Sequence, residues 1–354
     1  MSWSGKSATQ GTSRLGANNG TGTDKRALFL KQFSGEVLTS FEEKNVAMPL
    51  HRVRTINNGK SASFPTIGTS TAAYHAAGTQ IFGDSVPSKE VVVTVDDLLV
   101  SAAFIPKIDE AMNHYDVRST YSSELGNALA NAADRNIFSV VYKAATATAG
   151  SGDIEGQWAH ADFAGLSDTN AGVGGVDGQA GRIDLNSTAN EGTAAPNAEQ
   201  IVDGIMNSLM QFDKHDVTGE KSVVLDPVTY YALMAGDSRA VNRDFGGTGG
   251  IVSGTVPSIG GAKIYMSNHL PTASTGMTSP LANESGRAST VYTGSTNSNL
   301  KGLVFTKDAA ATVKLLDLGV ESEYQIDRQG TLMVAKYAMG HNVLRNKSAI
   351  ALVA

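Results

Sequence analysis

The chain has 354 residues, of which 41% are hydrophobic and 18% charged, so it holds enough apolar material for one or two buried cores and is not a disordered protein. It contains 38 glycines and no cysteine, which excludes a disulfide framework and cysteine-ligated zinc sites. The sequence shows no secretory signal and no apolar run of membrane-spanning length, which predicts a soluble intracellular product.

The net charge of -6 is unevenly distributed. Residues 1–60 carry nine Lys or Arg against four acidic residues, whereas residues 61–354 carry 19 against 30. Clustered cations displace counterions from nucleic acid, so a basic segment on an acidic body is one sign of contact with phosphate. A solvated tail explains the same balance about equally well.

The amino-terminal third is predicted to form a polar leader, a short helix and a long hairpin. Apolar residues recur at roughly helical spacing over residues 25–43. Residues 52–67 and 89–95 read as extended, and a loop rich in Gly, Ala and Thr joins them over 68–87. A hairpin of that length has little core of its own, so it should be stable only on another surface, such as a neighbouring subunit.

A long helix is predicted over residues 117–145. Pro106 opens a helical turn before it, and Asp116 has the character of a helix cap. No proline interrupts residues 117–145, alanine is frequent, and the apolar positions keep to one face. The polar group around Asp116 and Arg118 is interpreted as this cap together with interface hydrogen bonds, because a cap satisfies the free N–H groups of a helix start.

The rest of the chain predicts alternating strands and helices and then a strand-rich end. Residues 148–197 are rich in Gly, Ala, Asp, Asn and Thr with little periodicity, which is typical of a surface insertion. Beyond it we expect an amphipathic helix at 198–212, a helix opening at Asp226, and strands at 222–225, 263–267, 302–306, 312–324, 331–339 and 349–354. This pattern predicts an α/β or α+β fold.

No motif for catalysis or cofactor binding is found. The Gly-Lys-Ser triplets at 5–7 and 59–61 lack the earlier glycine that a phosphate-binding loop requires. The seven histidines have no helical ligand spacing, and no serine lies in a Gly-x-Ser-x-Gly motif. We therefore predict no catalytic, cofactor-binding or metal-ligating residue, and a protein that is not an enzyme.

Four sequence blocks follow one another along the chain: DKRALFLKQFSGEVLT at 24–39, GKSASFPTIG at 59–68, DEAMNHYDVRS at 109–119 and AKYAMGH at 335–341. Together they resemble the major capsid protein of T-seven-like podoviruses, a group that includes phages of cyanobacteria. The Ala-Met-Asn-His-Tyr-Asp-Val-Arg-Ser block is specific. Residues 148–197 and 273–299 depart from the family's pattern, because both are richer in Gly, Ser and Thr.

The resemblance implies the Hong Kong 97 phage capsid fold, an α+β fold with four parts. They are an N-terminal arm at 1–55; an extended β-hairpin loop at 56–92; a peripheral domain at 93–147 and 311–340 with a long spine helix at about 117–145; and an axial domain at 148–310 and 341–354 that includes the Gly-rich insertion 148–197.

The resemblance also implies a structural subunit of the virion that self-assembles into the hexamers and pentamers of an icosahedral shell. The implied partners are other copies of the chain, a scaffolding protein during assembly in the host bacterial cytoplasm, a portal at one vertex, and packaged double-stranded DNA on the inner face. No membrane and no cofactor are implied. The alternative is an encapsulin-like bacterial compartment, whose shell has the same fold and encloses cargo enzyme instead of DNA.

The predicted assembly interface contains apolar and charged residues. Apolar side chains of the arm and the loop would bury against neighbours, at about 1.5–3 kcal/mol each. Exposed ion pairs between subunits would contribute only about 0–1 kcal/mol each. The predicted interface residues are Leu28, Phe29, Phe33, Phe64 and Ile67 in the apolar group, and Arg52, Arg54, Lys60, Asp116 and Arg118 in the charged group.

Overall fold

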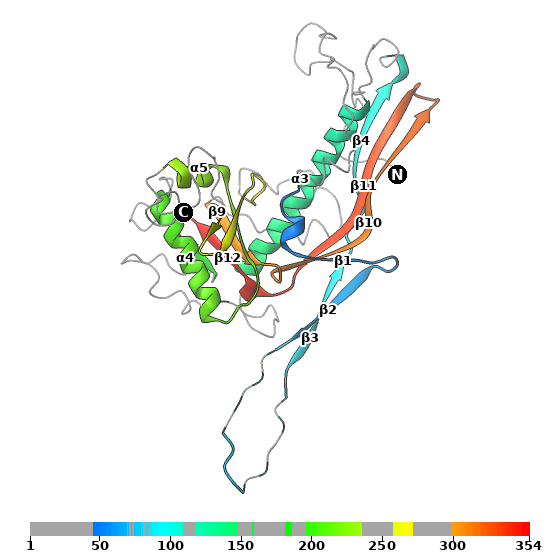
Figure 1. The fold of residues 1–354 in the computed structure, drawn as a ribbon. Coiled ribbons are helices and arrows are strands. Elements are labelled where there is room, and N and C mark those ends of the chain that lie inside the picture. Colours follow the sequence, from blue (N-terminus) through cyan, green and yellow to red (C-terminus); the bar gives the residue numbers. More distant parts are fainter. Residues whose placement is uncertain are drawn as a thin grey trace.

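The computed structural model describes residues 45–68, 70, 72, 74–78, 80, 83, 85–108, 118–147, 158, 181–185, 196–235, 258–271 and 299–354. These residues form an α+β fold, as predicted, with one six-stranded sheet, one four-stranded sheet, a two-stranded hairpin and packed helices (Figure 1). No helix in this part of the chain is long and apolar enough to cross a membrane.

The six-stranded sheet lies between helices on both of its faces. Its strands follow the order β5 (Arg182–Asp184), β12 (Ala349–Val353), β9 (Leu300–Thr306), β6 (Lys221–Leu225), β8 (Ala262–Met266) and β7 (Ser258–Ile259). Alternate residues of the central strands are buried on opposite faces: Val304 packs toward α4 (Ala198–Lys214) and α5 (Pro227–Ala235), and Leu303 and Phe305 pack toward α3 (Arg118–Ala145). Both faces are therefore apolar, as expected for strands covered on two sides.

The four-stranded sheet has the order β1 (Arg52–Thr55), β10 (Ala310–Gln325), β11 (Gly330–Val343) and β4 (Leu99–Pro106). β10 and β11 form a long antiparallel hairpin, and β1 runs parallel to β10 with Arg52 opposite Ala311. The strands of the carboxyl-terminal region lie where the sequence predicted them. β4 was not predicted, because it directly precedes the expected helical turn at Pro106.

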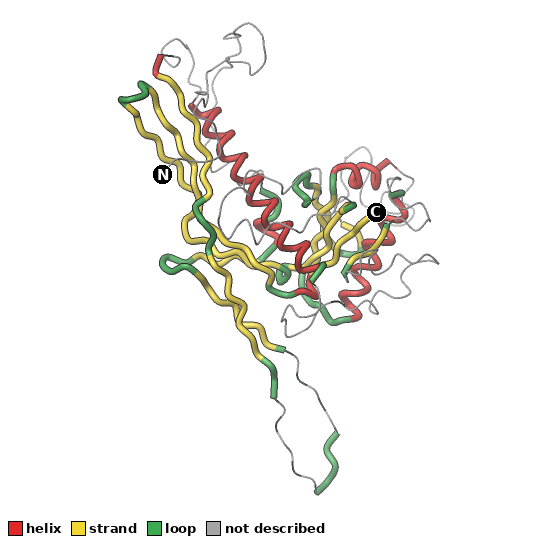
Figure 2. The backbone as a smooth tube through the Cα atoms, turned by 180° about the vertical axis from the view of Figure 1, so that it is seen from behind, coloured by secondary structure: helices red, strands yellow, loops and turns green. Residues whose placement is uncertain are grey.

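A second hairpin projects away from the two sheets (Figures 1 and 2). β2 (Ser61–Ile67) and β3 (Ser88–Thr94) pair antiparallel, from Ser61 opposite Thr94 to Ile67 opposite Ser88. This confirms the predicted two-stranded excursion. Its two strands connect to β1 and β4, which are the opposite edges of the four-stranded sheet.

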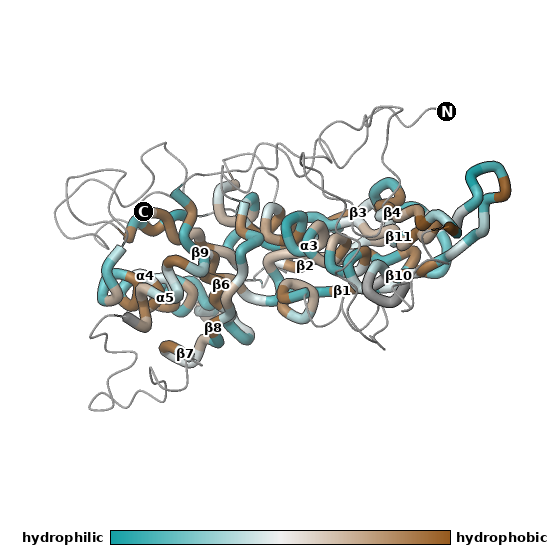
Figure 3. The backbone as a smooth tube through the Cα atoms, turned by 90° about the horizontal axis from the view of Figure 1, so that it is seen from above, coloured by the Kyte–Doolittle hydropathy of each residue, from teal (hydrophilic) through white to brown (hydrophobic). Residues whose placement is uncertain are grey.

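Helix α3 belongs to both large cores. It has 28 residues and so extends about 40 Å. Its first half packs Leu125, Leu129 and Ala133 on the four-stranded sheet, and its second half packs Ile137 and Phe138 under the six-stranded sheet. Figure 3 shows α3 running from one part of the elongated molecule to the other. The long helix predicted at 117–145 is thus confirmed within one residue.

Candidate assembly surfaces

The root of the β2–β3 hairpin is fixed on one face of the four-stranded sheet. Ala62, Val93 and Val95 pack against residues of β10 and β11 on the face opposite α3. The N–H of Val95 donates to the carbonyl of Lys60 at 2.8 Å, and the N–H of Asp96 donates to Met339 at 3.2 Å. These contacts fix the root of the hairpin to the four-stranded sheet.

Gly340 allows this close approach. A Cβ atom at this position would lie 2.1 Å from the carbonyl oxygen of Thr94 and 2.8 Å from the Cα of Val95. Real Cβ atoms do not approach other atoms so closely. The chain can cross β11 here only because residue 340 has no side chain.

Beyond its root the hairpin exposes apolar side chains. Ile67 is 64% exposed, and Tyr74, Val86 and Val92 are exposed as well. Phe64 is half-buried and packs on the hydrophobic cluster at the root. Of the two apolar loop residues predicted for the interface, Ile67 is thus available to a partner, and Phe64 already contacts its own subunit.

Two predicted ion-pair residues have partners inside the subunit. The Nε of Arg52 lies 2.5 Å from Oδ1 of Asp308, with the arginine side chain 56% exposed. A guanidinium N–H of Arg54 donates to the carbonyl of Ser63 at 2.9 Å and so connects β1 to β2. Lys60 is exposed in the turn between these strands. Sequence reasoning had no signal for the Asp308 contact, since the two residues are far apart in the chain.

The other predicted interface residues cannot be placed. Leu28, Phe29, Phe33 and Asp116 lie outside the described residues. Arg118 begins α3, but the description does not include its side chain.

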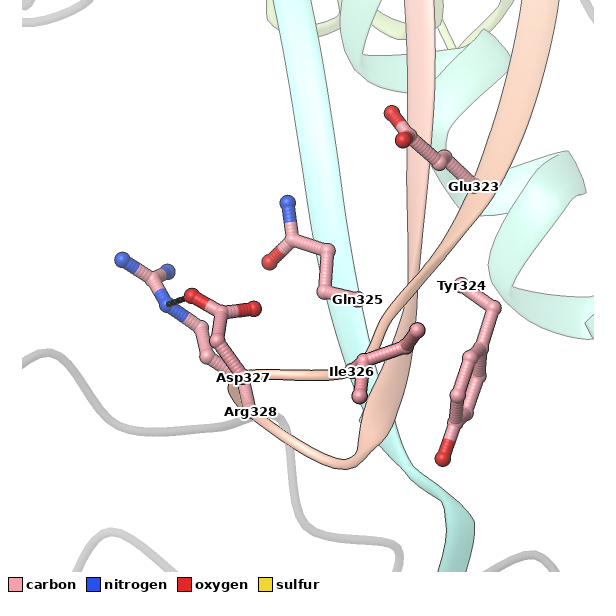
Figure 4. A pocket seen from close by; sticks show the side chains of 6 residues that line it. All are labelled: Glu323, Tyr324, Gln325, Ile326, Asp327 and Arg328. Atoms are coloured by element: carbon pink, nitrogen blue, oxygen red, sulfur yellow. Dashed lines mark ion pairs between the residues drawn. The ribbon is translucent and has the colours of Figure 1, made fainter.

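The tip of the β10–β11 hairpin is a shallow hollow that the sequence did not indicate. Its lining is a continuous run, Glu323, Tyr324, Gln325, Ile326, Asp327 and Arg328 (Figure 4). Ile326 is 75% exposed, and the Lys107 ammonium lies 5.4 Å from the centre of the Tyr324 ring. Asp327 and Arg328 form an exposed ion pair at 3.9 Å, which contributes little to stability.

A buried hydrogen-bonded chain, which sequence reasoning missed, connects the start of the described chain to α3 and the four-stranded sheet. Oδ1 and Oδ2 of Asp134 accept the N–H groups of Ala47 and Val46 at 3.0 and 3.1 Å. Nδ1 of His51 lies 2.8 Å from the carbonyl oxygen of Ala47, and its Nε2 lies 2.5 Å from the hydroxyl of Thr312. That hydroxyl is 2.7 Å from Nδ1 of His341.

Burial shifts the pKa values of two residues of this chain, Asp134 and His51. Removal from water raises the pKa of Asp134 to about 6, although the two backbone N–H groups favour its charged form. Removal from water also lowers the pKa of His51 to about 4, and the positive charge of Lys314 acts in the same direction. His51 is therefore neutral at pH 7.

Within the described residues no three His, Asp or Glu side chains lie close enough to hold a metal ion. The family model described as "Gp10A-like: Major capsid protein" matches residues 63–353. The chain belongs to the Gp10A-like major capsid protein family.

Relatives in this family align over nearly the whole chain. The major capsid protein of Escherichia phage T7 is 30% identical over 361 residues, which cover 97% of this chain and 97% of the relative. The major capsid protein of Enterobacteria phage T3 is 32% identical over 359 residues, with the same coverage. The resemblance to T-seven-like phages is confirmed.

Solved capsids have the same fold. The capsid structure of the cyanophage P-SCSP1u matches with a TM-score of 0.65 at 35% identity, over 98% of this chain and 99% of that one. The mature capsid of bacteriophage PhiM1 matches with a TM-score of 0.62 at 18% identity, over 94% of both chains, and shows the fold alone. The Hong Kong 97 fold and the role of phage major capsid protein are thus confirmed, and the encapsulin-like alternative is not favoured.

Proposed function

We propose that this major capsid protein forms the hexamers and pentamers of an icosahedral shell around double-stranded DNA and catalyses no reaction. The observation that carries this proposal is the β2–β3 hairpin, which projects from the body with an apolar side chain, Ile67, 64% exposed. An isolated two-stranded hairpin is marginally stable in water. A neighbouring copy would supply the missing surface.

The division into parts follows from the same proposal. We assign residues 1–55 to the arm, 56–92 to the extended loop, 93–147 and 311–340 to the peripheral domain, and 148–310 and 341–354 to the axial domain. The contents of the two sheets support this assignment, because β10 and β11 lie in the four-stranded sheet and β12 joins the six-stranded one.

The proposed partners are a scaffolding protein during assembly in the host cytoplasm, a portal at one vertex, and DNA along the inner face. The excess of Lys and Arg in residues 1–60 supports contact with phosphate. The proposed interface keeps Leu28, Phe29, Phe33, Ile67, Lys60, Asp116 and Arg118. It also keeps Phe64, Arg52 and Arg54, whose contacts within the subunit leave only part of each side chain for a neighbour.

Electron microscopy of the expressed protein tests the proposal. The chain is produced alone and together with the neighbouring genes of its phage, and the nucleic acid content of any particles is assayed. Uniform icosahedral shells whose closure depends on the added genes support the proposal. A discrete small oligomer under both conditions would contradict it.

Ile67→Asp is expected to abolish or strongly reduce shell formation and to leave the isolated subunit stable. A charge at an exposed site changes subunit stability by no more than about 0.5 kcal/mol, but in an interface it would be buried without a partner. The measurements are particle yield by electron microscopy and the unfolding temperature of the unassembled subunit.

Val228→Asp on α5 is the matched control, since Val228 is 66% exposed and lies outside the proposed interface. It should assemble normally. Equal loss of shells in both variants would show that the effect is not specific to the hairpin.

A further inference from the structure

The buried chain of hydrogen bonds around His51 has only one consistent direction when His51 is neutral. The carbonyl oxygen of Ala47 can only accept, so Nδ1 of His51 carries the hydrogen. Nε2 is then the acceptor, and the hydroxyl of Thr312 donates to it. The same hydroxyl oxygen accepts from Nδ1–H of His341.

The other end of the chain is equally constrained. The backbone N–H of Ala47 donates to Asp134, while the backbone carbonyl of the same residue accepts from His51. The backbone of Ala47 thus links Asp134 on α3 to His51, which in turn contacts Thr312 on β10. All five residues of the chain, Asp134, Ala47, His51, Thr312 and His341, are at most 5% exposed.

The charged and titratable groups around the chain come from several elements. Lys314 on β10 acts on His51, whose neighbour Arg52 pairs with Asp308. Burial raises the pKa of Tyr337 on β11, and the nearby carboxyls of Asp134 and Asp96 act in the same direction. Water is excluded from this chain of hydrogen bonds, so the loss of any one of them lowers the free energy of unfolding.

We propose that Asp134, His51, Thr312 and His341 are positioning residues that fix the segment Asn45–His51 between α3 and the four-stranded sheet. The segment directly follows residues 1–44 in the sequence. It follows, given the arm role proposed above, that these four side chains fix the carboxyl-terminal part of the arm to its own subunit. Losing one of them releases the segment and leaves both sheets folded.

Thr312→Val tests the proposal, since it keeps the shape and the strand preference of residue 312 and removes its hydroxyl. We expect amide hydrogen exchange in residues 46–51 of the unassembled subunit to become about tenfold faster, and exchange in β6 and β9 to stay unchanged. Asp134→Asn should act alike, because an amide has one acceptor oxygen for two N–H donors. Thr312→Ser keeps the hydroxyl of residue 312, so exchange in residues 46–51 should stay as slow as in the wild type.

Thr306→Val is the matched control. Thr306 is also buried, at 2% exposed, but its hydroxyl has no hydrogen-bond partner among the described residues, so exchange should not change. Unchanged exchange at residues 46–51 in Thr312→Val and Asp134→Asn would overturn the proposal, as would an equal rise across β6 and β9. Faster exchange in residues 46–51 together with normal shells would support the positioning role of the four side chains. It would contradict only the proposal that the arm is needed for assembly.

Discussion

Subunits carrying Gly340→Ala are expected to lose about 3 kcal/mol of folding free energy and to form no closed shells. The added Cβ would lie 2.1 Å from the Thr94 carbonyl oxygen and 2.8 Å from the carbon of the same carbonyl. Both are backbone atoms, so no side-chain rotation relieves the overlap. The hairpin root must move off β11, and the hydrogen bond from Asp96 to Met339 is lost with it. Urea unfolding of the unassembled subunit measures the change.

Gly319→Ala provides the control in the same sheet. Gly319 lies on β10, and a Cβ there would meet no atom of the described residues within 4 Å apart from its chain neighbours. We expect a change within about 0.5 kcal/mol and normal shells. A similar loss in both variants would mean that β-sheet glycines are needed for a reason other than the close approach of Thr94.

Asp134→Asn is expected to make the subunit more sensitive to acid than the wild type between pH 6.5 and pH 4. The pKa of Asp134 is raised from 3.8 to about 6, so the stability linked to it is fully present below pH 3.8 and is lost as the pH rises through 6. The pKa of His51 is lowered from 6.5 to about 4, so its contribution is present above pH 6.5 and is lost as the pH falls through 4. In the wild type the two effects oppose each other.

In Asp134→Asn, the stability that the wild type gains in acid from protonation of Asp134 is absent. The stability lost as His51 is protonated is then no longer offset. Because the variant lacks the gain from Asp134, its free energy of unfolding should fall relative to the wild type by about 2 kcal/mol between pH 6.5 and pH 4. His51→Gln should show the opposite trend and gain on the wild type over the same range. Urea unfolding at pH 7, 6, 5 and 4 measures the free energy of unfolding of both variants and of the wild type. Parallel pH profiles of the two variants would show that Asp134 and His51 do not affect stability in opposite directions.

The elements that the sequence predicted well are those with a strong local pattern. The apolar face of α3 is continuous and no proline interrupts it, so its bounds were predicted within one residue. The alternation in β3 predicted the hairpin. β4 lacks such alternation, because every residue from Leu99 to Ile105 except Ser101 is apolar, and it directly precedes the helical turn expected at Pro106, so it was missed.

The candidate sites were predicted less well, because they depend on contacts between distant residues. His51 and Thr312 are 261 positions apart, and no spacing rule connects them. Arg52 was predicted to form an ion pair with a neighbouring subunit, yet Asp308 of its own subunit lies within reach once β1 has paired with β10. Exposure of Ile67 was predictable, since it ends a strand of a hairpin that has no core of its own.

The hairpin's attachment has a consequence for the divergence of related shells. Its two strands return to opposite edges of the four-stranded sheet, and its root is fixed by residues at the base of β2 and β3. Among the described residues, the pairing of β2 with β3 ends at Ile67 and Ser88, and no strand of the two larger sheets pairs with residues 68–87. Mutation can therefore lengthen or shorten this connection and change the reach of the subunit, while both cores keep their packing.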